Sequence, residues 1–182
     1  MNRCYVGVGA NLGEPLATLR WLHKQLQSNA TLQQLVFSPI YKSAPVGPGQ
    51  QDDYLNAVVA FDSDLDPEDL LGQLLALESL AGRVRDGTRW GPRILDLDLL
   101  LVGLLSVRSA RLEIPHPRLE ERNFVLQPLI DLLGSAWRLP NGHRLQDSLD
   151  KCEENRLERT KLSWEAQAMD KPATGSALRD AS

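Results

Sequence analysis

The stretch RWGPRILDLDLLLVG, residues 89–103, places two aspartates inside an otherwise aliphatic segment. A run of Leu, Ile and Val between Pro92 and Gly103 predicts a strand buried on both faces, where an unpaired charge is costly. Side chains alternate along a strand, so Asp96 and Asp98 project to one side, roughly 6.5 to 7 Å apart. Some partner must therefore compensate the two negative charges.

Magnesium is one partner that two such carboxylates can share. It takes one or two protein carboxylates and completes its shell with water and substrate phosphates. The alternative is structural, because an isolated DxD pair can also cap a strand end or bind two arginines. Four arginines flank the pair, namely Arg83, Arg85, Arg89 and Arg93. Arginines beside metal-binding aspartates are typical of phosphoryl-transfer sites, which work by positioning and charge neutralisation.

Four other residues are weaker candidates when taken one at a time. Asn56 alternates with apolar residues on a predicted core strand, and a buried amide needs hydrogen-bond partners. Tyr54 and Phe124 are aromatic, and an aromatic residue more often packs in a core than stacks on a ligand. His116 lies between two prolines, and a lone histidine is usually structural.

The glycines of GVGANLG suggest a dinucleotide fold at first sight. Gly7, Gly9 and Gly13 are, however, spaced one residue too wide for the GxGxxG fingerprint, and the predicted order of elements is wrong for that fold. We interpret the three glycines as a tight turn from strand to helix.

The elements that must position these residues follow from apolar periodicity and from Pro and Gly punctuation. We expect strands over 4–9, 32–43, 54–61 and the aspartate segment, and helices over 15–28 and 67–80. The order β-α-β-β-α-β predicts an α+β fold of the ferredoxin-like kind, an antiparallel sheet with helices on one face. Asp66 caps the second helix, and Glu78 falls on its apolar face. The segment FVLQPLIDLLG adds a further helix.

Composition gives the bounds of the problem. The 182 residues fit one domain, which we place at 1–150, and the polar segment 151–182 has too few apolar residues to pack well and looks disordered over its last dozen. No apolar run approaches the ~20 residues of a membrane span, and the N-terminus does not resemble a secretory signal, so we expect a cytoplasmic protein. Cys4 and Cys152 lie at opposite ends, which argues against a disulfide framework and a zinc site.

Four motifs, in order along the chain, resemble one family. VGANLG, SAPVGPGQQDDYLNAVV, GRVRDGTRWGPRILDLDLLLVG and IPHPRLEERNFVLQPL are similar to the signatures of 6-hydroxymethyl-7,8-dihydropterin pyrophosphokinase, an enzyme of folate biosynthesis. The resemblance covers about residues 4 to 150. It implies transfer of pyrophosphate from ATP to the hydroxymethyl group of a reduced pterin, with release of AMP and with two magnesium ions.

The resemblance also implies roles for individual residues. Both metals are held by Asp96 and Asp98, while Arg83 and Arg93 act on the phosphates as catalytic residues. The pterin stacks between Tyr54 and Phe124. Its edge and surroundings are assigned to Asn56, the backbone of Ser43, Ala44, Pro45 and Val46, and Trp90. ATP is assigned to Glu78, Arg83, Arg85, Arg93, Arg111, His116 and Arg122.

A function of another class is a ferredoxin-like module that binds RNA, with arginines on the backbone and aromatics stacked on bases. Asp96 and Asp98 count against it, because paired carboxylates repel a polyanion unless metals intervene. The net charge of −4 likewise gives no general attraction to nucleic acid. We therefore expect a monomeric enzyme whose partners are ATP and the pterin, with neither nucleic acid nor membrane as a partner.

Overall fold

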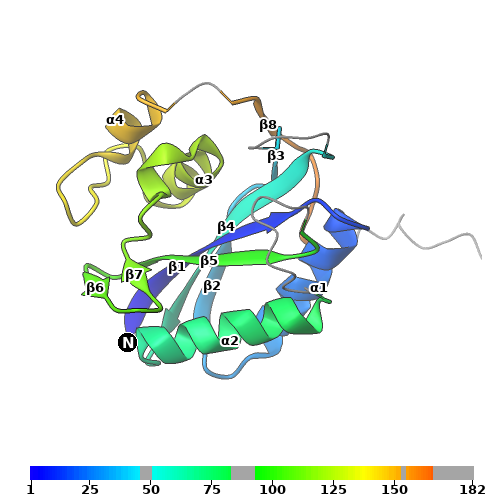
Figure 1. Ribbon diagram of the computed structural model, residues 1–182, viewed down its shortest axis with the longest axis horizontal. Helices are drawn as coiled ribbons and strands as arrows, with labels where there is room; N and C mark the ends of the chain where they lie inside the picture. The colour runs from blue at the N-terminus through cyan, green and yellow to red at the C-terminus, as the bar shows by residue number, and fades with distance from the viewer. Residues whose placement is uncertain (46–50, 83–92, 153–154, 166–182) are drawn as a thin grey trace, which may run out of the picture.

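A six-stranded antiparallel sheet forms the centre of the computed structural model, which describes residues 1–45, 51–82, 93–152 and 155–165 (Figure 1). Its strand order is β5-β1-β4-β3-β8, and β2 pairs with β4 beside β3. The strands are β1 (Asn2–Ala10), β2 (Gln33–Phe37), β3 (Tyr41–Ser43), β4 (Tyr54–Ser63), β5 (Asp96–Val102) and β8 (Leu157–Arg159). A separate hairpin joins β6 (Val107–Arg108) to β7 (Glu113–Ile114). The expected α+β fold with an antiparallel sheet is confirmed.

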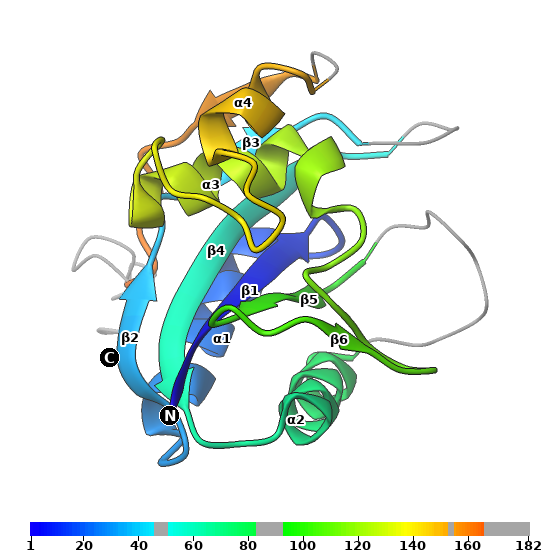
Figure 2. The same cartoon turned by 90° about the vertical axis from the view of Figure 1, so that its left-hand side faces the viewer.

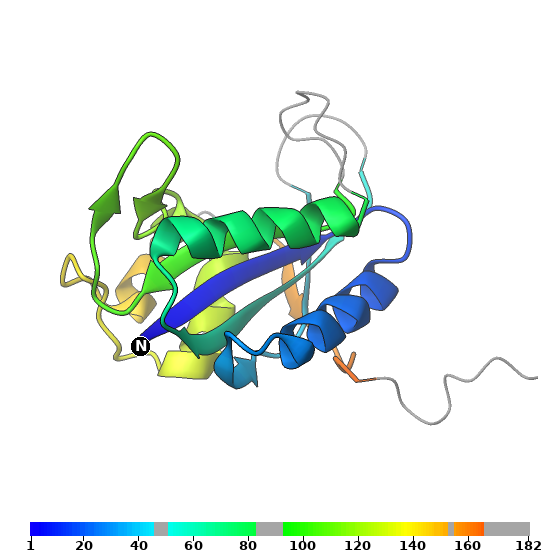
Figure 3. The ribbon, with the colours of Figure 1, turned by 90° about the horizontal axis from the view of Figure 1, so that it is seen from below.

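Helices cover both faces of the sheet. Figure 3 shows α1 (Pro15–Ser28) and α2 (Pro67–Leu80) along one face. The other face carries the 3-10 turn η1 (Leu119–Glu121), α3 (Asn123–Leu133) and α4 (Leu145–Leu149), with α3 lying over β4 and α4 packed on α3 (Figure 2). Each face has its own hydrophobic cluster. The prediction of helices on one face only is therefore wrong, because the segment expected merely to add to the fold closes the second face. No helix in the described ranges is long and apolar enough to cross a membrane.

Both long helices have the predicted bounds, and local chemistry explains them. Pro15 and Pro67 occupy first-turn positions, where a missing N–H costs nothing. The Asp66 side chain accepts a hydrogen bond from the backbone N–H of Glu68 at 3.0 Å. In α1 the buried side chains repeat at helical spacing and pack onto the sheet; they are Leu19, Leu22, His23 and Leu26.

The single strand expected over 32–43 is two strands. Pro39 has no N–H to donate to a ladder, so the chain breaks there between β2 and β3. Ser38 keeps the broken region attached to β4, because its N–H donates to the Val58 carbonyl at 2.9 Å and its Oγ accepts from the Val58 N–H at 2.9 Å. The consequence is that β3 is a separate short strand, which pairs with β4 on one side and with β8 on the other.

The expectation that residues after 150 pack poorly is wrong for residues 155–165. Within this stretch β8 adds to the sheet beside β3, and Trp164 is buried with its Nε1–H donating to the Ser38 carbonyl at 2.9 Å. A count of apolar residues missed this, because backbone pairing needs no apolar side chain and a single tryptophan supplies a large buried area. The disorder expected for the last dozen residues falls within 166–182, outside the described residues.

Candidate active site

Two glycines of β1 form the floor of the site. In the sheet Gly9 is paired with Asn56 of β4 on one side and with Asp96 of β5 on the other, and Gly7 is paired with Asp98. A Cβ at Gly9 would lie only 3.3 Å from the Asn56 Oδ1. The interpretation of the glycines as a turn is therefore wrong for Gly7 and Gly9; Gly13, with φ of +70°, is the one that fits it.

A cavity of about 900 Å³ opens above this floor. Its walls come from the ends of β3, β4 and β5, from the start of α3, and from the chain just before β8. It brings together most of the residues that the sequence pointed to, namely Ser43, Ala44, Pro45, Tyr54, Asn56, Arg93, Asp96, Asp98, Arg122 and Phe124. Val46, Arg83, Arg85 and Trp90 lie outside the described residues.

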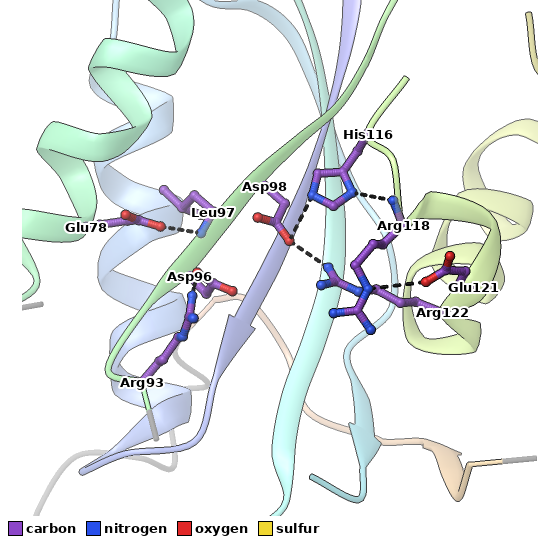
Figure 4. A network of polar contacts seen from close by, with 9 residues as sticks. All are labelled: Glu78, Arg93, Asp96, Leu97, Asp98, His116, Arg118, Glu121 and Arg122. Carbon is purple, nitrogen blue, oxygen red and sulfur yellow. Dashed lines mark hydrogen bonds and ion pairs between the residues drawn. The ribbon is translucent and has the colours of Figure 1, made fainter. Parts of the chain in front are cut away.

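Each carboxylate of the pair has an arginine partner (Figure 4). Arg93 Nη1 donates to Asp96 Oδ1, and Arg122 Nη1 donates to Asp98 Oδ2 at 2.8 Å. The aspartate side chains are 27% and 32% exposed, so the expected burial on both faces of the strand does not hold at this end of β5. These arginines compensate the two negative charges, as we expected that some partner must. Arg122 lies 24 residues after Asp98 in the chain.

His116 lies beside the same carboxylate. Its Nδ1 accepts a hydrogen bond from the backbone N–H of Arg118 at 3.1 Å, and its Nε2 is 3.9 Å from Asp98 Oδ2. Burial lowers the pKa of His116, with Asp98 opposing the shift. A neutral ring that accepts at Nδ1 carries its proton on Nε2, so it offers a donor beside Asp98.

Asn11 was not singled out from the sequence, yet it holds the backbone on both sides of the site. It is 3% exposed. Its Oδ1 accepts from the Arg93 N–H at 2.8 Å, its own N–H donates to the Arg93 carbonyl at 3.0 Å, and its Nδ2 donates to the Asp52 carbonyl at 3.1 Å. The signal that could have found it is the one applied to Asn56, an amide next to a buried strand.

On the β4 side, the cavity is lined by neutral side chains. Asn56 is 4% exposed and donates from Nδ2 to Ser43 Oγ at 2.8 Å, so the prediction that its buried amide has a partner is confirmed. Tyr54 is half-buried on the same strand, and burial raises the pKa of its phenol. Phe124, at the start of α3, lies on the opposite wall with the Arg122 guanidinium 5.8 Å from its ring centre.

Three described residues assigned to ATP are not among the residues that line this cavity: His116, which lies beside Asp98, and also Glu78 and Arg111. Glu78 is 1% exposed, and its Oε1 accepts from the Leu97 N–H at 2.8 Å (Figure 4). It therefore fastens α2 to β5 between the two aspartates. Arg111 is exposed between β6 and β7.

The carboxylate pair suits a metal that draws further ligands from a substrate. Among the described residues, no three His, Cys, Asp or Glu side chains form a group that could hold a metal ion alone. Magnesium characteristically uses one or two carboxylates together with phosphate oxygens and water. The oxygens of Asp96 and Asp98, half-exposed at one cavity wall, fit that requirement.

Comparison with known proteins decides the family. Residues 5–134 match the family described as 7,8-dihydro-6-hydroxymethylpterin-pyrophosphokinase (HPPK). The chain belongs to the HPPK family. It is 42% identical over 159 residues to the 2-amino-4-hydroxy-6-hydroxymethyldihydropteridine pyrophosphokinase of Pseudomonas aeruginosa, covering 87% of this chain and 97% of the relative. Identity to the enzyme of the same name from Bacillus subtilis is 37%, over 72% of this chain and 78% of that one.

Solved structures agree on the fold. The HPPK-DHPS of Plasmodium falciparum, solved with pteroate, superposes with a TM-score of 0.63 at 13% identity and covers 82% of this chain. Our chain spans 42% of the length of that protein. The family match and the curated relatives confirm the HPPK resemblance seen in the four sequence motifs.

Proposed function

We propose that this HPPK family member transfers pyrophosphate from ATP to the hydroxymethyl group of 6-hydroxymethyl-7,8-dihydropterin, releasing AMP, in folate biosynthesis. The observation that carries the proposal is the division of its cavity. On the β5 side, two carboxylates and two arginines line the cavity and His116 lies beside Asp98; on the β4 side, an amide, a hydroxyl and a phenol ring line it, with the Phe124 ring on the opposite wall. The first set suits a triphosphate and its metal ions, while the second suits a flat, neutral heterocycle.

On the charged side, Asp96 and Asp98 would hold two magnesium ions. When bound, magnesium neutralises phosphate charge and orients the oxygens of an in-line displacement. Arg93 and Arg122 supply fixed positive charge beside the carboxylates, and Asp96 raises the pKa of Arg93 against the lowering effect of burial. The His116 Nε2–H faces the same region and would donate to a phosphate oxygen. Arg83, Arg85, Arg111 and Glu78 stay predicted contributors to ATP binding.

On the neutral side, Tyr54 and Phe124 would contact the two faces of the pterin ring. Asn56 has its amide held in place by Ser43, so the donor and acceptor that it presents are oriented before the ligand arrives. The backbone of Ser43 to Val46, together with Trp90, completes the predicted pterin site. An amide at the ring edge would reject analogues that lack the matching groups.

The strand order β5-β1-β4-β2 supports a ferredoxin-like core within the larger sheet. Residues 1–150 are proposed to form the catalytic domain, with 155–165 packed against it. A monomeric state and a cytoplasmic location stay predictions from the sequence. An RNA-binding module is not favoured, since the chain belongs to an enzyme family and its cavity places two carboxylates where a polyanion would have to lie.

Product analysis tests the proposal. The protein would be incubated with ATP, magnesium and the reduced hydroxymethylpterin, and the nucleotides separated by anion exchange. We expect AMP and a pterin diphosphate in equal amounts. Formation of ADP, or of AMP without a modified pterin, would contradict the assignment.

A further inference from the structure

The segment 155–165 begins at the cavity wall and continues along β3. Its strand β8 pairs with β3, with Arg159 opposite Tyr41 and Leu157 opposite Ser43 (Figure 1). Since β3 ends where the cavity begins, the residues just before β8 reach the cavity wall. Asn155 is one of the lining residues.

This segment holds the cavity wall formed by the end of β3, through hydrogen bonds to the backbone of Ala44. The Ala44 N–H donates to the Arg156 carbonyl at 3.2 Å, and the Asn155 Nδ2 donates to the Ala44 carbonyl at 3.3 Å. The Arg156 side chain also pairs with Asp53, the residue before Tyr54. The N–H and the carbonyl of Ala44, the residue after Ser43, are thus both held by hydrogen bonds to residues 155 and 156.

Asn155 also contacts the opposite cavity wall, which the start of α3 forms. Asn123, the first residue of α3 and the neighbour of Phe124, donates from Nδ2 to the Asn155 carbonyl at 2.7 Å. Asn155 therefore contacts one wall with its side chain and the other with its carbonyl. The two hydrogen bonds lie in series between Ala44 and Asn123.

The far end of the segment is fixed as well. Both the N–H and the Oγ1 of Thr160 donate to the Ile40 carbonyl, at 3.0 and 2.8 Å. Trp164 then packs against Phe37 with ring centres 4.9 Å apart. These contacts fix residues 160–164 to the sheet. Asn155, which links the two cavity walls, therefore belongs to a segment that is held in place outside the cavity; we call this segment the brace.

We propose that Asn155 is a positioning residue that sets the separation of the two cavity walls and thereby the affinity for the pterin. This inference rests on the proposed function. A flat ring held between two aromatic faces needs them about 7 Å apart, twice the optimal contact distance, and dispersion falls quickly as a gap opens. Asn155, which the sequence placed outside the catalytic domain, thus belongs to its substrate site, and the residues that follow it anchor it to the sheet.

The test uses Asn155→Ala, Asn123→Ala and the double variant of the full chain. Asn2→Ala is the matched control, because Asn2 is exposed at the opposite end of β1 from Gly9. Pterin affinity is measured by titration with a nonhydrolysable ATP analogue and magnesium at saturation. Steady-state kcat and KM are measured alongside, and thermal unfolding shows that each variant is folded.

We expect each single variant to raise the pterin Kd and KM roughly fivefold, the usual effect of one lost hydrogen bond, with kcat at saturating pterin and nucleotide affinity within about twofold. Because the bonds act in series, the double variant should be no weaker than the weaker single one. Unchanged pterin affinity in both single variants, or losses that multiply in the double variant, would overturn the brace. Failure of the wild type to bind the pterin would instead overturn the proposed function.

Discussion

The two sides of the cavity, which lie on one sheet, differ in the charge and the burial of their side chains. On the β5 side, Asp96 and Asp98 are charged, half-exposed and each paired with an arginine. On the β4 side, Asn56 is neutral, almost fully buried and paired with a hydroxyl. Between them runs β1, which presents Gly9 and therefore no side chain.

The difference shows how burial and charge are matched. A charge can stand at a wall only where water or a counter-ion reaches it, whereas a neutral amide can be buried once it has a partner. The glycine strand keeps the two environments apart without filling the space where two substrates must meet. We therefore expect substitutions on the two sides to have separable effects.

The largest effect is expected on the charged side. Asp96→Asn or Asp98→Asn keeps the shape but removes the anionic oxygen that magnesium prefers, so turnover should fall by orders of magnitude. Stability should change by no more than about 1 kcal/mol, since ion pairs that water still reaches contribute little. AMP production at saturating magnesium and thermal unfolding measure the two effects. Asp64→Asn, an exposed site, is the control, and near wild-type AMP production by either active-site variant would show that the carboxylates are structural.

On the neutral side, Asn56→Ala should weaken pterin binding by about 2 kcal/mol, because the ligand edge and the Ser43 hydroxyl both lose a partner. Affinity for the nucleotide should stay within about twofold of wild type, since the amide lies across β1 from the phosphate side. Titration with each ligand measures both effects. Loss of nucleotide binding with intact pterin binding would reverse the assignment of the two sides.

The floor between the sides can be tested with Gly9→Ala. The added Cβ would crowd the Asn56 Oδ1 at 3.3 Å, and overpacking of this kind should weaken pterin binding about tenfold. Gly72→Ala, on α2 with no neighbour within 4 Å of its added Cβ, is the matched control and should slightly stabilise the protein. Equal pterin affinity in wild type and Gly9→Ala would show that β1 does not need its glycine there.

The smallest effect concerns Glu120 at the cavity rim. Burial alone would raise its pKa, but hydrogen bonds from Ser148, His143 and Asn141 outweigh burial and lower the pKa below the usual 4.5. A depressed pKa in the folded state contributes stability above the unfolded pKa, and this contribution is lost as the pH falls through the folded pKa. Between about pH 6 and about pH 3.5 the wild type should therefore lose more free energy of unfolding than Glu120→Gln. Equal losses, measured by urea unfolding across this range, would show that these hydrogen bonds do not lower the pKa of Glu120 in the folded state.

The sequence predicted those parts of the fold that rest on local chemistry. Both long helices follow from Pro15, the Asp66 cap and apolar spacing, and Asn56 followed from the rule that a buried amide needs a partner. Contacts between distant segments were harder. Arg122 as the partner of Asp98, Asn155 as a wall residue and the packing of Trp164 all depend on tertiary arrangement that no local pattern encodes. Asn11 was missed although its type and position gave the same signal as Asn56.

The separation of the two sides is the central claim, and a crossed titration tests it most directly. Asp98→Asn and Asn56→Ala would each be titrated calorimetrically with a magnesium-bound, nonhydrolysable ATP analogue, and then with the pterin at saturating nucleotide. We predict that Asp98→Asn weakens the nucleotide and spares the pterin, and that Asn56→Ala does the reverse. Equal weakening of both ligands by both variants would contradict a cavity divided by the glycine strand.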